Sequence, residues 1–387
     1  MFRTGFKGFI IFMVFLFPTL LKSMPANHDS IDNQMPVVEV VFCLDLSGST
    51  NGLIDNVREQ VWSVVNMIAT ASPKRKLRIG LVGFSRPSFG GQNNYVKTIS
   101  KLTDDYDLLV AEMWKIKPQI EKGDQFVSSA LEAAGLNMNW SKSKDAVKVL
   151  FLIGNGRVDT GSPDYRSVVS TISENDIYLV PVYCLRERKS NEIEGWNQIG
   201  RIVNRPIEAI WVLKRDPLIK PAKDEGRLAQ WNRDLNRLLI SYSKESKEYL
   251  NAVITCDNKS MILHPVSYEN RLFYRVSEHC LNKLQKWDLA AANLTSASDL
   301  LRYDMSLMED SLQRRTINRI YDGIEKGNES KAILIDKIKK QLPYERQLFL
   351  NSIVSKPDFE SSQILEKVVL RNVLNACKAK SISFPVE

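Results

Sequence analysis

An apolar run at residues 37–44 ends in Asp45 and leads directly into a polar segment that contains Ser47 and Ser49. Such a run is typical of a buried strand, and the polar residues after it mark the start of a loop. A loop that curls after the strand can turn the three oxygen-bearing side chains toward one point. One carboxylate with two hydroxyls suits a hard divalent cation such as Mg²⁺. The segment therefore predicts a cation site at the end of a buried strand.

Strand-like and helical segments alternate along residues 36–213. The expected strands are 37–44, 77–84, 95–99, 147–153, 177–182 and 209–213, with 95–99 antiparallel to its neighbour. The expected helices are 53–70, 108–116, 126–136 and 165–175. This alternation predicts an α/β fold with a mostly parallel, Rossmann-like central sheet and helices on both faces. Ligands of such sheets bind beyond the carboxyl ends of the strands, where Asp45 and Asn155 both fall.

Residues 1–26 have the composition of a secretory signal peptide. Arg3 and Lys7 precede an apolar run at residues 9–17, which is short for a membrane span. We expect cleavage near Ala26 and export to the periplasm, the cell envelope or the medium. If the segment stays uncleaved, it provides a membrane association instead.

The charge balance does not point to nucleic acid. The whole chain carries +8, but residues 1–26 hold three of the positive charges and no acid, so residues 27–387 carry +5. That value is ordinary for a solvated surface.

The pattern changes near residue 214, where helical periodicity replaces strand signals. Helices are expected at 224–250, 298–326, 329–342 and 361–376, the last capped by Ser361, with breaks at Gly323, Gly327 and Pro343. The stretches 253–255, 261–263 and 272–274 look strand-like. We therefore expect an α-rich C-terminal region, 214–387, that leans on the first domain.

The five cysteines show no zinc-binding spacing. Cys43 and Cys184 lie in apolar strand-like runs and are expected in the core. Cys256 and Cys280 either pair in an oxidising compartment or stay free, and the odd count leaves at least one free thiol.

The Asp45-x-Ser47-x-Ser49 motif, with a strand before it and a helix after it, resembles the metal-ion-dependent adhesion site of the von Willebrand factor A domain. The resemblance covers about residues 36–213, and the helical tail resembles that of secreted bacterial members. The family adds a Thr from a second loop and an Asp from a third. Those places fall on Asp124 and Asn155, so the implied metal ligands are Asp45, Ser47, Ser49, Asp124 and Asn155.

Two of these places depart from the family pattern. Asp124 is either a ligand or a cap of the helix at 126–136. Asn155 still offers an amide oxygen but removes a negative charge, which weakens cation binding unless Asp159 compensates. Arg86 and Arg157 are expected at the rim of the same face, either as attractors of an acidic partner or as plain solvated surface. Trp196 is expected to pack against the sheet.

Taken with the resemblance, these residues imply a non-enzymatic interaction or adhesion module of the cell envelope. Its divalent cation, Mg²⁺ or else Mn²⁺ or Ca²⁺, would accept an Asp or Glu carboxylate from a partner. Two alternatives stay open: a metal-independent scaffold with a degenerate site, and an accessory subunit of a periplasmic enzyme. No histidine has a neighbour that would make a catalytic arrangement.

Overall fold

The computed structural model describes residues 36–117, 120–187, 191–214, 225–263, 265–354 and 361–384, and residues 36–387 form one compact unit. The expected signal peptide lies outside these residues. Residues 215–224 also lie outside them, and the domain boundary at residues 213 and 214 stays a prediction. Within the described ranges, no helix is both long and apolar enough to cross a membrane.

A six-stranded sheet forms the centre of the fold, as predicted. Its strands are β1 (Val37–Asp45), β2 (Lys76–Phe84), β3 (Lys97–Thr103), β4 (Val147–Gly154), β5 (Tyr178–Cys184) and β6 (Glu208–Ile210). Their order is β3-β2-β1-β4-β5-β6, and β3 alone pairs antiparallel among the strands described. The predicted segment 95–99 is partly wrong: Tyr95 has a positive φ of 54° in the turn before β3, which displaces the strand to later residues.

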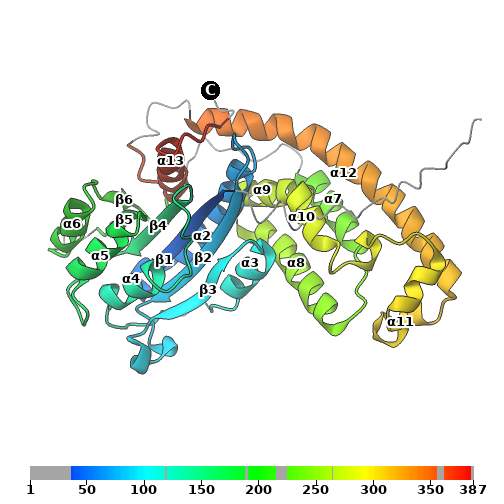
Figure 1. Cartoon of the computed structure of the whole chain (residues 1–387), viewed down its shortest axis with the longest axis horizontal. Helices are drawn as coiled ribbons and strands as arrows, with labels where there is room; N and C mark the ends of the chain where they lie inside the picture. Colours follow the sequence, from blue (N-terminus) through cyan, green and yellow to red (C-terminus); the bar gives the residue numbers. More distant parts are fainter. Residues whose placement is uncertain are drawn as a thin grey trace, which may run out of the picture. The chain divides into compact units, whose positions relative to one another are not determined.

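Strand β1 lies in the middle of the sheet and sends its side chains into two separate cores. Val40 and Phe42 pack on the face covered by α2 (Leu53–Ile68) and α3 (Tyr106–Trp114). Val41 and Cys43 pack on the face covered by α4 (Val127–Gly135), α5 (Tyr165–Glu174) and α6 (Ile193–Ile202). Burial on both faces explains why the strand sequence is almost wholly apolar. Figure 1 shows the strands side by side with their helices.

The region after residue 214 is rich in helices, as predicted. Its helices are α7 (Glu225–Arg237), α8 (Lys244–Leu263), α9 (Pro265–Arg275), α10 (Glu278–Leu284), α11 (Asp310–Gln313), α12 (Ile317–Val354) and α13 (Leu365–Lys378). The stretches 253–255, 261–263 and 272–274 are helical, so the strand-like interpretation is wrong. Val253 and Leu272 are fully buried apolar residues of α8 and α9. A short apolar run does not distinguish a buried helix from a buried strand.

Two other details of the helical region differ from the expectation. Helix α12 continues through Gly323, Gly327 and Pro343 rather than breaking there. A glycine costs a helix about 1 kcal/mol, and the buried Ile320 and Ile324 anchor this one on its apolar side. Helix α13 begins after Ile364, and Ser361 does not cap it.

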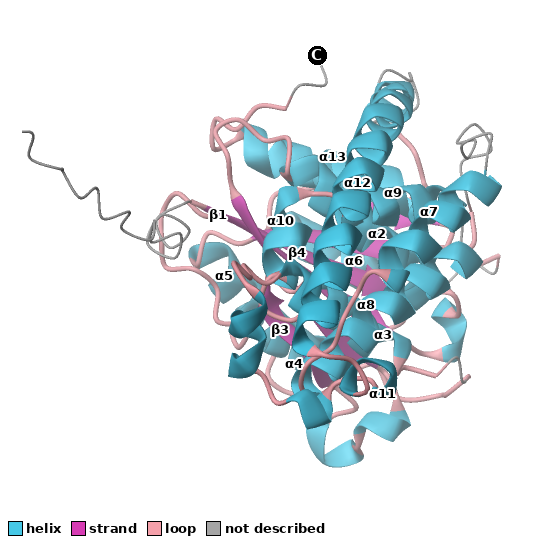
Figure 2. Ribbon diagram, turned by 90° about the vertical axis from the view of Figure 1, so that its right-hand side faces the viewer, coloured by secondary structure: helices cyan, strands magenta, loops and turns pink. Residues whose placement is uncertain are grey.

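Helix α2 shows that the C-terminal helices cover the sheet domain directly. All its residues except Asp55 are buried, including several polar ones. Asn66 Nδ2 donates to Asn270 O of α9 (2.9 Å), and Ser63 Oγ donates to Glu366 Oε1 of α13 (3.2 Å). Buried polar groups need such partners. The polar face of α2 is therefore an interface with the helical region, and the helices lie in front of the strands in Figure 2.

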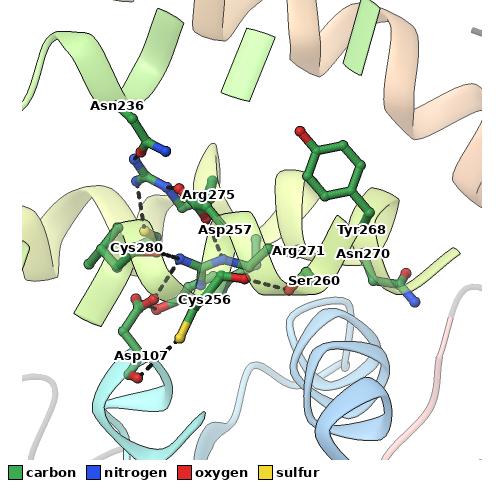
Figure 3. A network of polar contacts seen from close by, with 12 residues as sticks. Asp107, Asn236, Cys256, Asp257, Ser260, Tyr268, Asn270, Arg271, Arg275 and Cys280 are labelled. Atoms are coloured by element: carbon green, nitrogen blue, oxygen red, sulfur yellow. Dashed lines mark hydrogen bonds and ion pairs between the residues drawn. The ribbon is translucent and has the colours of Figure 1, made fainter. Parts of the chain in front are cut away.

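A buried ion network joins the same two parts of the molecule. Arg271 of α9 pairs with Asp107 of α3 and with Asp257 of α8, both at 2.6 Å. Arg275, one turn later, pairs with Asp257 at 3.0 Å. All four side chains are at most 2% exposed, and Figure 3 shows them converging between three helices. The negative charge of each carboxylate is balanced by these guanidinium groups.

Replacing Arg271 by Ala should therefore be strongly destabilising. The change leaves Asp107 without its cation and Asp257 with Arg275 alone, which costs about 3–5 kcal/mol. Urea unfolding of the full chain measures this loss. Arg237→Ala is the control because that guanidinium is 72% exposed in its pair with Asp234, and it should cost no more than about 1 kcal/mol. Equal losses in the two variants would contradict the network's role.

Candidate functional site

Asp45 ends β1, and the loop after it folds back over the end of the strand. A short 3-10 turn, Gly48–Thr50, follows the strand, and α2 begins after Gly52. Thr50 Oγ1 donates to the carbonyl oxygens of Asp45 (2.6 Å) and Ser47 (3.0 Å). These two hydrogen bonds fix the curl of the loop. They hold Ser47 and Ser49 on the same side as the Asp45 carboxylate.

The Asp45 carboxylate is fully buried and receives hydrogen bonds from three segments. Its Oδ1 accepts from the backbone N–H of Ser47 (2.9 Å). Its Oδ2 accepts from Gln125 Nε2 (3.1 Å) and, at 3.4 Å, from the N–H of Asn155. Burial raises the pKa of Asp45, and the hydrogen bonds from Ser47 and Asn155 only partly oppose that rise.

The outer part of the site is a chain of three side-chain oxygens. Ser49 Oγ donates to Asn155 Oδ1 at 2.9 Å and lies 2.8 Å from Ser47 Oγ. Because Ser49 has a single proton, Ser47 is the donor to Ser49. The structure thus brings together four of the five predicted ligands, from the loops after β1 and β4.

Gln125, rather than Asp124, is the residue of the second loop that contacts Asp45. Asp124 is exposed, and no hydrogen bond or ion pair involves it within the described ranges. It does not cap α4 either, since Phe126 holds the N-cap position without a side-chain hydrogen bond. Gly156 has a φ of +86°, and any side chain there would collide with the Gln125 amide.

Arg186 was not predicted, although it lies at the centre of the outer oxygens. Its Nη2 donates to Ser49 Oγ (3.2 Å) and to Asn155 Oδ1. Arg186 lies two residues after the end of β5, so the rule that placed Asp45 and Asn155 at the carboxyl edge of the sheet also applies to it. Its position just after a predicted strand was therefore the signal in the sequence that could have identified Arg186.

The two arginines that the sequence suggested are both paired with carboxylates. Arg86 is buried, and its Nε donates to Glu121 Oε1 (2.7 Å). Arg157 and Asp159 form an exposed pair at 2.8 Å, which also raises the pKa of Arg157 through the hydrogen bond. Both oxygens of Asp159 therefore accept hydrogen bonds from Arg157. Trp196 packs against the sheet as expected, and its Nε1 donates to Gly156 O (2.9 Å).

The oxygens of this cluster are suitable in kind for a divalent cation, but their arrangement here does not fit one. Arg186 already donates to Ser49 and Asn155, and both oxygens of Asp45 accept hydrogen bonds. Asp45 is the one anionic group in the cluster, whereas Mg²⁺ and Ca²⁺ favour carboxylate ligands. Across the described part of the chain, no group of three or more His, Cys, Asp or Glu is placed to hold a metal. The Mg²⁺ site stays a prediction.

The five cysteines are all buried and free, so Cys256 and Cys280 do not form a disulfide. Burial raises the pKa of both thiols.

The contacts of His279 are structural. Its ring stacks on Tyr106 with a centroid distance of 5.0 Å, and its Nε2 lies 2.9 Å from Asp104 O.

Residues 39–205 match the family model of the von Willebrand factor type A domain. No curated protein matches the chain.

The solved structures that match this chain have low sequence identities and low TM-scores to it. One is proximal thread matrix protein 1 from the mussel byssus, in a structure with a zinc-occupied MIDAS (metal-ion-dependent adhesion site) motif. It is 13% identical with a TM-score of 0.31, and the match covers 44% of this chain and 46% of that one. Pilus adhesin SpaC from Lactobacillus rhamnosus GG is 13% identical with a TM-score of 0.34, over 46% and 28%. A von Willebrand factor type A protein from Catenulispora acidiphila is 13% identical with a TM-score of 0.34, over 47% and 39%. This chain spans less than half of each of them.

The raised pKa of Asp45 gives a pH-dependent stability. Because the folded state holds this proton more tightly than the unfolded chain, the free energy of unfolding falls as the pH rises through the interval above 3.8. Asp45→Asn removes the buried charge, so its melting temperature at pH 8 should exceed that of the wild type, and the gap should narrow toward pH 4. Asp124→Asn, at an exposed position on the same loop as Gln125, should show no gap. Calorimetry in EDTA measures the melting temperatures of both variants and of the wild type. A melting temperature of Asp45→Asn below that of the wild type at pH 8 would contradict the account.

Proposed function

Residues 39–205 form a von Willebrand factor type A domain, and we propose that this domain binds a protein partner through the carboxyl edge of its sheet. Domains of this family commonly serve protein interaction and adhesion. The observation that carries the proposal is the convergence of Asp45, Ser49, Asn155 and Arg186 from three different strand ends. Such an arrangement gives a polar centre that can hold one acidic group of a partner.

Exposed apolar side chains beside this centre support a protein partner. Ile120 is 71% exposed and Leu213 is 77% exposed. Side chains at Gly48 and Gly52 would collide with Ile120 and Leu213, respectively, so both apolar residues lie directly against the loop after β1. Aliphatic contacts around a charged centre are typical of protein interfaces.

The chemistry of the cluster favours binding over catalysis. The Asp45 carboxylate is enclosed by hydrogen bonds from the N–H of Ser47 and from Gln125. The hydroxyls of Ser47 and Ser49 are hydrogen-bonded to one another and to an amide oxygen. The carboxylate beside Ser47, that of Asp45, already accepts hydrogen bonds on both oxygens and is poorly placed to activate a hydroxyl. We therefore propose a non-enzymatic module.

Two further elements of the proposal rest on the sequence. The N-terminal composition supports export to the cell envelope or beyond. The positive charge that meets the partner's carboxylate comes either from a divalent cation held by Asp45, Ser47, Ser49 and Asn155 after Arg186 has moved, or from the chain itself.

Site-specific photo-crosslinking tests the location of the partner. A photoreactive residue at Ile120 should yield a crosslinked protein adduct in the source cells, because that side chain is exposed at the proposed edge. The matched control is Lys142, which is exposed and precedes β4, at the opposite end of the sheet. Equal adducts at the two positions, or none at Ile120, would contradict the proposal.

A further inference from the structure

We propose that the guanidinium of Arg186 is the cation of this site and takes a partner's carboxylate directly, so that a divalent metal is not needed. The proposal rests on the proposed function, because it assumes that a partner's acidic group binds at this edge. It assigns the positive charge to one residue of the chain. It also names the kind of partner segment that the edge recognises.

The guanidinium of Arg186 lies among the oxygens that the sequence assigned to a metal ion. Its Nη2 donates to Ser49 Oγ and Asn155 Oδ1, which are two of those oxygens. A guanidinium at that point supplies the donors and the positive charge that these oxygens would otherwise receive from an ion. Asn155 fits this arrangement, because its neutral amide oxygen accepts from Arg186 without the second negative charge that a divalent cation favours.

Arg186 is held by a carboxylate of the chain less closely than Arg86 and Arg157 are. Arg86 and Arg157 are hydrogen-bonded to carboxylates at 2.7 and 2.8 Å. The Arg186 side chain is 32% exposed, and its Nη1 lies 3.7 Å from Glu192 Oε2, beyond hydrogen-bonding distance. Partly exposed ion pairs of this kind contribute little to stability. A partner's carboxylate can therefore replace that contact at small cost and form a shorter, charge-assisted hydrogen bond.

The surroundings of Arg186 define the partner segment. Ile120 and Leu213 lie against Gly48 and Gly52, and Ser49 between these glycines contacts Arg186. A segment that places a Glu or Asp on Arg186 therefore brings its neighbouring residues toward exposed aliphatic side chains. The expected ligand is a protein segment with one carboxylate flanked by apolar residues.

A peptide array tests this inference on the full chain. The probes are pentapeptides with a central Glu and flanking Leu, Ile or Phe, each matched with a twin that carries Gln instead. In EDTA, the wild type should bind Glu peptides about tenfold better than their Gln twins, since charge-assisted hydrogen bonds differ from neutral ones by about that factor. Arg186→Gln should lose the preference, and Arg186→Lys should keep part of it. Arg157→Gln, an exposed arginine of the same edge, should keep all of it.

The outcomes separate this inference from the proposed function. Preference for Glu in EDTA that disappears in Arg186→Gln supports both. Preference that appears only when Mg²⁺ is added overturns the role of Arg186 and leaves the proposed function in place. Preference in EDTA that survives in Arg186→Gln also overturns it. Absence of any Glu preference in the wild type, with and without Mg²⁺, counts against the proposed function itself. Unchanged melting temperatures of the variants confirm that the fold is intact.

Discussion

The buried carboxylate of Asp45 is the constraint around which the edge of the sheet is organised. It ends the central strand, is fully buried, and forms no ion pair with any residue in the described ranges. A charge in that position must be compensated by hydrogen bonds. The loop after β1 turns back to supply the N–H of Ser47, and the second loop supplies Gln125. Gly154 allows β4 to pass close to Asp45, where a side chain would collide with it.

The same constraint separates the site into an inner and an outer part. The inner part satisfies Asp45 with hydrogen bonds alone, so its charge is held by neutral donors. The outer part consists of the Ser47 and Ser49 hydroxyls and the Asn155 amide oxygen, and Arg186 donates to the last two. The guanidinium is therefore displaced from the carboxylate toward solvent. A positive group in that position can meet an acidic partner while Asp45 keeps the loops in place.

The helical region packs directly against the helices that cover the sheet. It buries the polar face of α2, the helix that begins just after the site loop, through contacts of Asn270 and Glu366. The network of Arg271 with Asp107 and Asp257 fixes α8 and α9 against α3. Because α2 and α3 cover one face of the sheet, the position of the site loop depends on these helices as well as on the strands.

Much of the fold follows from local patterns in the sequence. The apolar run before Asp45, and the uncharged run before Asn155, are long enough to identify strands and to place both residues at one edge. The contact of Gln125 with Asp45 does not follow from the sequence, because it depends on how a loop without regular structure turns. Arg186 was missed because a long side chain after a strand can point to solvent or back across the edge. Ser63 and Asn66 look solvent-exposed in the sequence, since their hydrogen-bond partners lie in helices far along the chain.

The central claim is that the cation of this site belongs to the chain. Thermal unfolding of residues 27–387 with Mg²⁺, Mn²⁺ or Ca²⁺, compared with EDTA and with the Asp45→Ala variant, tests it most directly. A bound ion at about 100 times its dissociation constant would stabilise the protein by about 2.7 kcal/mol, a clear shift in melting temperature. With Arg186 in place, the account predicts no shift at millimolar metal. A rise of the wild-type melting temperature with metal that is absent in Asp45→Ala would contradict it.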